Sequence, residues 1–261
     1  MGERVRHAKA PPRRRRPAAA PSADPAELAR FDALAAEWWN ASGPMRALHR
    51  LNPTRIAFVR DRLAARAGRD PLKPHPLRGL RILDMGCGAG PLAEPLTRLG
   101  ASVVGADAAA ESIAVAKAHA DAGGLAIDYR ATTAEALTRA GETFDAVLAM
   151  EILEHVRDPK AFIATLVALT KPGGILLMAT LNRTPKSFAF AIVGAEYVLG
   201  WVPRGTHDWQ KFVRPSELAR ALRAAGFALT EVVGVGYDLV TDGWRLTDDP
   251  SVNYMAAAER G

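Results

Sequence analysis

The sequence predicts an α/β protein built on an open, mostly parallel sheet of seven strands. Three observations lead to this prediction. Between residues 81 and 180, short apolar runs alternate with segments of helical periodicity. A glycine-rich turn at residues 86–90 follows the first of these runs, and the single cysteine, Cys87, rules out a disulfide framework or a multi-cysteine zinc site. Strands that alternate with helices of this length form right-handed βαβ crossovers, so the strands are parallel.

The first expected elements form an N-terminal helical cap over residues 23–78. A helix should begin at Asp24, because Asp-Pro-Ala-Glu provides an N-cap, a proline at the first helical position and an acid in the first turn. A second amphipathic helix is expected after Asn52-Pro53, over residues 54–67. A proline-rich linker at 70–78 then leads into the sheet.

The remaining elements alternate along the chain. Strands are expected at 81–85, 101–106, 126–130, 144–150 and 175–180, with helices at 91–99, 110–120, 133–139 and 159–170. Lys171-Pro172-Gly173-Gly174 should stop the last helix and turn the chain. A helix at 215–225 and strands at 227–235 and 252–258 complete one folded domain over residues 23–261.

Residues 1–22 carry the whole formal net charge of +6, since they hold seven arginines and lysines against one glutamate. This tail has no apolar segment suited to a secretory signal, and its four prolines disfavour an amphipathic transit helix. We expect it to be disordered.

The rest of the chain is neutral, which argues against a nucleic-acid partner. No stretch has the ~20 apolar residues of a membrane-spanning helix, and the lone cysteine favours a reducing compartment.

The loop after the first strand indicates the cofactor. Gly86, Gly88 and Gly90 follow the acid Asp84 in a G-x-G-x-G spacing, whereas a dinucleotide fingerprint requires a further glycine where Pro91 stands. Asp84 would also repel a pyrophosphate, so a nicotinamide dehydrogenase is the least favoured function. S-adenosylmethionine carries a sulfonium and an ammonium and no phosphate. Asp107, at the end of the next strand, can accept its ribose hydroxyls.

With these motifs the sequence resembles the class I S-adenosylmethionine-dependent methyltransferases, which have a Rossmann-like fold. Among them it is similar to the ubiquinone-biosynthesis O-methyltransferases, which methylate phenolic hydroxyls of polyprenylated quinone precursors. The resemblance runs from about residue 30 to the end and departs from the family in the basic tail and at Ala89. It is carried by the segments 36–39 (Ala-Glu-Trp-Trp), 48–55, 84–90, 150–156, 171–174, 180–183, 193–197, 203–208 and 252–255.

The resemblance implies a cofactor site lined by Arg55, Gly86, Asp107 and Met150. Arg55 can pair with the methionyl carboxylate, and Met150 can pack on the adenine. Asp84 and Gly88, which belongs to the same loop as Gly86, complete the predicted set of cofactor-binding residues.

Glu151, Glu154 and His155 follow the fourth strand, and in a helix their spacing would place them on one face. His155, with Glu151, could deprotonate a phenol, which is largely un-ionised at neutral pH. Alternatively, all three could bind a divalent cation. The resemblance favours magnesium, although two carboxylates and an imidazole also suit other metals.

Residues 186–212 are expected to cover the substrate and to contact the membrane, because a polyprenylated phenol or catechol resides in the bilayer. Apolar and aromatic residues with basic flanks are typical of segments that bind an anionic lipid surface. His207, beside Asp208, is a candidate substrate-side residue. We therefore expect a cytoplasmic enzyme held peripherally at the inner membrane, or at the matrix side in a mitochondrion, with other ubiquinone-biosynthesis proteins as candidate partners.

Two alternative functions stay open. One is a nucleic-acid or other small-molecule methyltransferase of the same fold. Enzymes that methylate nucleobase amino groups commonly place Asn/Asp-Pro-Pro-aromatic after the fourth strand, where this chain has Glu151-Ile152-Leu153-Glu154. The other is a catalytically silent, lipid-binding adaptor, which methyl transfer from labelled S-adenosylmethionine to a lipid extract would exclude.

Overall fold

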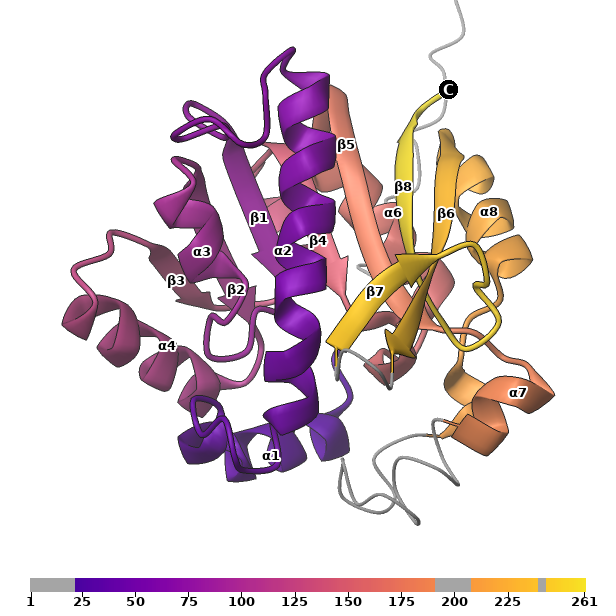
Figure 1. The fold of residues 1–261 in the computed structure, drawn as a ribbon, viewed down its shortest axis with the longest axis horizontal. Helices are drawn as coiled ribbons and strands as arrows, with labels where there is room; N and C mark the ends of the chain where they lie inside the picture. Colours follow the sequence, from indigo (N-terminus) through magenta and orange to yellow (C-terminus); the bar gives the residue numbers. More distant parts are fainter. Residues whose placement is uncertain (1–21, 191–207, 239–242) are drawn as a thin grey trace, which may run out of the picture.

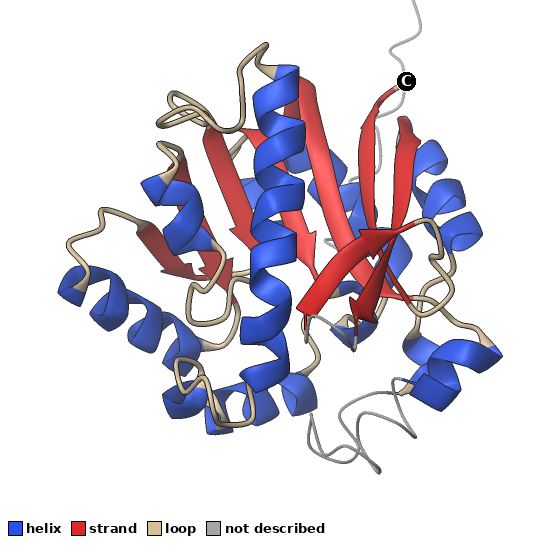
Figure 2. Cartoon of the chain, in the orientation of Figure 1, coloured by secondary structure: helices blue, strands red, loops and turns tan. Residues whose placement is uncertain are grey.

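The computed structural model describes residues 22–190, 208–238 and 243–261. Its strands form one sheet with helices on both faces (Figures 1 and 2). The strands are β1 (Arg81–Met85), β2 (Ser102–Asp107), β3 (Asp128–Ala131), β4 (Phe144–Met150), β5 (Thr170–Leu181), β6 (Phe227–Asp238), β7 (Gly243–Thr247) and β8 (Asn253–Arg260). The helices are α1 (Pro25–Ala33), α2 (Arg46–Arg66), α3 (Ala93–Arg98), α4 (Ala110–Ala122), α5 (Ala134–Arg139), α6 (Pro159–Leu169), α7 (Pro185–Ser187) and α8 (Pro215–Ala224), with short 3-10 turns η1 (Ala35–Glu37), η2 (Leu153–His155) and η4 (Trp209–Lys211).

The strand order β3-β2-β1-β4-β5-β8-β6-β7 fixes where a ligand can bind. The first five strands are parallel, while β8 runs antiparallel to β5 and β6, and β7 antiparallel to β6. After β1, the chain adds β2 and then β3 on one side of it, and then β4 and β5 on its other side. Ligands of open α/β sheets bind in the crevice at the carboxyl ends of the two strands where the order reverses, here β1 and β4.

The sheet separates two apolar cores. Successive residues of one strand point to opposite faces, so Leu83 belongs to the core beneath α5, α6 and α8, whereas Ile82 belongs to the core beneath α2, α3 and α4. The same alternation holds in β4, where Val147 and Leu148 lie in different cores. A parallel sheet that is covered on both faces has continuous apolar strands, as the sequence pattern predicts. The predicted α/β sheet is thus confirmed.

The predicted number of seven strands is wrong by one. The missed strand, β7, is short and lies at the edge of the sheet, where it pairs with the end of β6. Its alternation of Trp244 and Leu246 with polar neighbours is a strand pattern, but five residues give a weak signal. The predicted turn at Lys171 to Gly174 is present as an irregularity at the start of β5. There, Thr170 pairs with Phe144 but Ile175 already pairs with Ala146.

The second helix begins eight residues earlier than predicted, at Arg46, and contains Pro53 in its interior. A proline there removes one helical hydrogen bond. Tertiary contacts offset this loss, because the helix buries Phe58 and Val59 in the core and the side chain of Asn52 donates to the Pro91 carbonyl at 2.7 Å. The predicted start of α1 is confirmed, since Asp24 accepts a hydrogen bond from the amide of Ala26.

Parts of two predictions lie outside the described residues. These are the basic tail, of which only residue 22 is described, and residues 191–207 of the segment predicted to meet the membrane, including His207. Among the helices that the structure describes, none has the length and apolarity needed to cross a membrane.

Candidate active site

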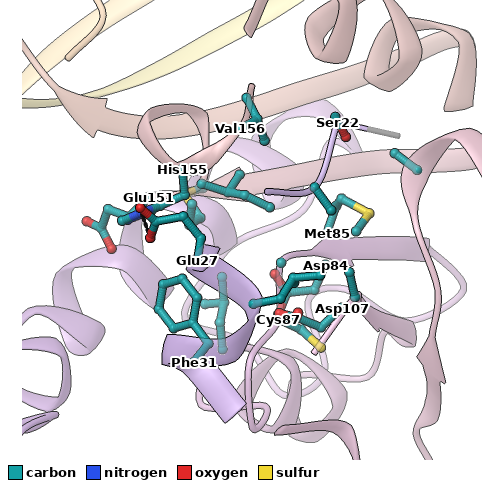
Figure 3. Close-up of a pocket in the computed structure, with 18 of the residues that line it drawn as sticks. Ser22, Glu27, Phe31, Asp84, Met85, Cys87, Asp107, Glu151, His155 and Val156 are labelled. Carbon is teal, nitrogen blue, oxygen red and sulfur yellow. Dashed lines mark hydrogen bonds and ion pairs between the residues drawn. The ribbon is translucent and has the colours of Figure 1, made fainter. Parts of the chain in front are cut away.

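A cavity of about 210 Å³ lies at the carboxyl ends of β1, β2 and β4. Figure 1 shows α1 lying across this end of the sheet. Asp84, Asp107 and Met150 line the cavity from the strand ends, and Glu27 and Trp38 line it from the N-terminal cap. In the close-up of Figure 3, the acids of β1 and β2 lie on one side of the pocket, and Glu27, Glu151 and His155 form a second polar group across it.

The glycine loop joins β1 to the site in a conformation that requires glycine. Gly88 has a φ of +52°, and a Cβ there would lie 2.3 Å from the ring of Trp38. Gly86 has a φ of +78°, and its amide donates to the Ala106 carbonyl at 2.7 Å. The loop backbone therefore approaches the pocket closely, as a bound cofactor requires. Trp38 is not among the residues that the sequence predicts for the site, although the Trp-Trp doublet is a signal for it.

Asp84 and Arg55 place opposite charges in the buried floor of the site. Their exposed fractions are 2% and 5%. Burial raises the pKa of Asp84 to about 7, against the opposing effect of the Arg55 charge. Within the described part of the chain, Asp84 Oδ2 and Arg55 Nε have no hydrogen-bond partner. Unpaired buried polar atoms are costly, and a ligand with both an ammonium and a carboxylate would satisfy this acceptor and this donor.

Asp107 ties the glycine loop to β2. Its Oδ2 accepts from the amide of Gly88 and its Oδ1 from that of Ala109, both at 2.9 Å. Burial raises the pKa of Asp107, and these amide hydrogen bonds oppose the rise. Each carboxylate oxygen keeps a second lone pair for a ribose hydroxyl, so the predicted role of Asp107 is compatible with this geometry.

Glu151 and His155 enter the pocket from the loop after β4. Glu151 adopts a left-handed backbone with a φ of +57°, which costs about 1–3 kcal/mol outside glycine and is most often found at functional sites. Its Oε2 lies 3.6 Å from Arg55 Nη1. His155 Nδ1 lies 3.0 Å from Glu27 Oε2, and the ring of Phe31 packs edge-on against the imidazole at 5.3 Å between centroids.

Glu154 does not join this group, and the expectation of three ligands on one helical face is wrong. The left-handed conformation of Glu151 breaks the helical spacing, and only residues 153–155 form a 3-10 turn. Glu154 is buried away from the cavity, where it accepts a hydrogen bond from Thr180 Oγ1 at 2.8 Å and burial raises its pKa. Over the described residues, no three His, Cys, Asp or Glu side chains are grouped to hold a metal ion. As they lie here, the three predicted ligands do not fit a divalent cation.

Comparison with known proteins identifies the family. A family model described as a methyltransferase domain matches residues 48–232. A relative from Parvibaculum lavamentivorans, named ubiquinone biosynthesis O-methyltransferase, is 55% identical over 243 residues, which cover 93% of this chain and 96% of the relative. A relative of the same name from Methylocella silvestris is 57% identical, with coverages of 92% and 95%. The chain belongs to the ubiquinone biosynthesis O-methyltransferase family.

Solved structures agree on the fold of this methyltransferase. The magnesium protoporphyrin IX methyltransferase of Synechocystis PCC 6803, solved with bound SAH, superposes with a TM-score of 0.57 over 79% of this chain and 82% of that one, at 20% identity. An S-adenosylmethionine-dependent methyltransferase from Clostridium acetobutylicum gives 0.58 over 89% and 98%, at 11% identity. The predictions of a class I methyltransferase fold and of an S-adenosylmethionine-dependent methyltransferase are confirmed.

Proposed function

We propose that this methyltransferase transfers the methyl group of S-adenosylmethionine to phenolic hydroxyls of polyprenylated catechol and hydroxyquinol intermediates in ubiquinone biosynthesis. The observation that carries this proposal is the likeness to enzymes of that name over more than nine-tenths of the chain. The buried, unpaired polar atoms of Asp84 and Arg55 support it, because they match the zwitterionic end of the cofactor.

The cofactor roles follow from the same residues. Asp84 would accept from the ammonium of the cofactor, and Arg55 would donate to its carboxylate in a charge-assisted contact. Asp107 would accept from the ribose hydroxyls, and Met150 would pack against the adenine. At Gly86 and Gly88 the loop backbone packs directly against Ile152 and Trp38, so a side chain at either position would disturb the wall of the site.

His155 is the proposed general base. When bound, S-adenosylmethionine supplies a methyl group whose bond to the sulfonium sulfur breaks on in-line attack, so that the sulfur leaves as a thioether. A phenol with a pKa near 10 is only about one part in 10³ ionised at neutral pH, so removal of its proton accelerates attack by the oxygen. The phenol proton passes to His155 Nε2, and the phenolate lone pair forms the new oxygen–carbon bond. Glu151 would hold the second hydroxyl of a catechol through Oε1, which is buried and without a partner in the described structure.

The divalent cation expected at Glu151, Glu154 and His155 lacks support in this arrangement. Glu154 would have to leave its hydrogen bond with Thr180 to reach the pocket, and His155 already has Nδ1 engaged with Glu27. The reaction proposed above therefore uses no metal. Assays of turnover with and without a chelator test whether the enzyme needs one.

We also propose that the segment 186–212 meets the membrane. In its described part, Phe188 and Phe190 are 47% and 62% exposed, which is unusual for large apolar side chains. A peripheral attachment to anionic lipid, on the cytoplasmic face of the inner membrane or on the matrix side, would give the site access to a polyprenylated substrate. The basic tail would add an electrostatic contribution.

The decisive experiment follows methyl transfer from labelled S-adenosylmethionine to a short-chain prenylated catechol. The wild type should methylate the catechol, and His155→Ala should lose about 10²- to 10⁴-fold in kcat while cofactor affinity is retained. Turnover that survives chelation would support His155 as the base. Turnover that is lost on chelation and restored by Mg²⁺ would show that the three predicted ligands rearrange around a metal. A wild type without methyl transfer would overturn the proposed function.

A further inference from the structure

The N-terminal helix α1 contacts His155 through the carboxylate of Glu27 and the ring of Phe31. Glu27 Oε2 lies 3.0 Å from His155 Nδ1, although the two residues are 128 positions apart in the chain. Figure 3 shows Glu27 and Phe31, both from α1, beside His155 at the pocket. The contact is partly buried, since the side chains of Glu27 and His155 are 19% and 15% exposed.

The charges around Glu27 keep its carboxylate ionised. Its Oε1 lies 3.6 Å from Lys211 Nζ, and Arg30 Nη1 lies 4.0 Å from Oε2. The hydrogen bond to His155 and these two cations favour the ionised form of the Glu27 carboxylate. An ionised carboxylate can only accept hydrogen bonds, so the proton between the two residues lies on His155 Nδ1.

A proton on Nδ1 determines what the other ring nitrogen can do. In the neutral imidazole, the second nitrogen then carries the lone pair and can accept a proton. The carboxylate also fixes the plane of the ring, which the edge-on contact with Phe31 restricts further. We propose that Glu27 is a positioning residue for His155, which it holds in the tautomer and orientation that present Nε2 to the phenol. This inference rests on the proposed function, because it assumes that His155 is the base.

The other tethers of the N-terminal segment provide matched controls. The amide of Glu111 donates to Asp32 Oδ1 on the same helix at 3.2 Å, and the amide of Ser22 donates to Glu135 Oε1 at 3.1 Å. Neither contact involves His155. Asp32→Ala removes the acceptor of the Glu111 amide and so perturbs the attachment of α1 without altering the partner of the imidazole.

The test compares two acceptor substrates that differ in their need for a base. One is a short-chain prenylated catechol, and the other is its nitro-substituted analogue, which is largely ionised at pH 8. Glu27→Ala should lower kcat for the catechol by about 10-fold or more, because loss of a carboxylate that orients a functional histidine costs about 10- to 10⁴-fold in other enzymes. It should leave kcat for the nitro analogue and the calorimetric affinity for S-adenosylmethionine within about twofold of wild type. Glu27→Gln keeps an acceptor oxygen and should lose less than the alanine variant, and Asp32→Ala should change neither rate.

Two results would overturn this role. Equal slowing of both substrates by Glu27→Ala would show that Glu27 only supports the fold of the cap. A Glu27→Ala, His155→Ala double variant that is slower than His155→Ala by the full Glu27→Ala factor would show that the two residues act independently, since residues that act as a unit are not additive. A wild type that methylates neither substrate contradicts instead the proposed function.

Discussion

Replacement of Asp84 by asparagine should stabilise the ligand-free protein and weaken cofactor binding. Burial raises the pKa of Asp84 from its ordinary 3.8 to about 7. Between these pH values the folded protein keeps the proton while the unfolded chain has lost it. The unfolded state then binds fewer protons, so the contribution of Asp84 to stability falls as the pH rises from about 4 to 7 and is constant above.

The magnitude follows from the difference between the two pKa values. A tenfold change in proton affinity corresponds to about 1.4 kcal/mol, so an ionised Asp84 at pH 8 costs at most about 4 kcal/mol. Asparagine has nearly the same shape and no charge. It also removes a neighbouring anion from Arg55, which offsets part of the gain. We expect Asp84→Asn to raise the free energy of unfolding at pH 8 by about 1–4 kcal/mol, with little difference near pH 4.

Urea unfolding of the ligand-free wild type and of Asp84→Asn at pH 5, 6, 7 and 8 measures this effect. Glu154 also has a raised pKa, but it is present in both proteins and cancels in the difference, whereas Asp107, whose charge contributes to the raised pKa of Asp84, cancels only in part. In calorimetry the same variant should bind S-adenosylmethionine at least about tenfold more weakly, since the ammonium loses its ionic partner. A stability difference that does not change with pH, or a variant less stable than wild type at pH 8, would refute the reasoning.

Three further predictions concern the loop, the ribose and the membrane. Asp107→Ala should weaken the binding of S-adenosylmethionine at least about tenfold, because both the ribose hydroxyls and the Gly88 amide lose an acceptor. An unchanged affinity in calorimetry, in a folded variant, would contradict the assignment of Asp107 to the ribose. Gly88→Ala should lower the thermal midpoint more than Gly141→Ala, a control with a similar φ of +73° but no described atom within 4 Å of its Cβ, and equal losses would exclude a clash with Trp38. Phe190→Ser should reduce flotation with anionic vesicles more than deletion of the basic tail does, and a wild type that stays in the soluble fraction would contradict the membrane proposal.

Several elements could be predicted almost to the residue. The strands at 81–85 and 144–150 have the predicted bounds, because each is an apolar run between clear turn or loop signals. The acid before the glycine loop and the acid at the end of the next strand also lie in the site as expected. Parallel strands bring such positions to one edge of the sheet, so residues far apart in the chain converge without any knowledge of packing.

Other features depended on contacts that no local pattern contains. Pro53 normally indicates a helix start, yet α2 continues through it because buried side chains on both sides stabilise the longer helix. The edge strand β7 depends on the end of β6, with which it pairs, and on α2, where Thr54 Oγ1 donates to the Trp244 carbonyl at 2.8 Å.

The sequence by itself determined the parallel sheet, the position of the glycine loop and the polar residues at the strand ends, because apolar periodicity and turn residues act over a few positions. Only the tertiary structure decided which of those polar groups meet. Glu154 turns to Thr180 in the core, whereas His155, its immediate neighbour, faces the pocket and takes a partner from α1. The backbone of Glu151 leaves the helical region, and this removes the periodicity from which a common face was expected. Side-chain direction there is set by packing between elements that are distant in sequence, so spacing alone could not predict it.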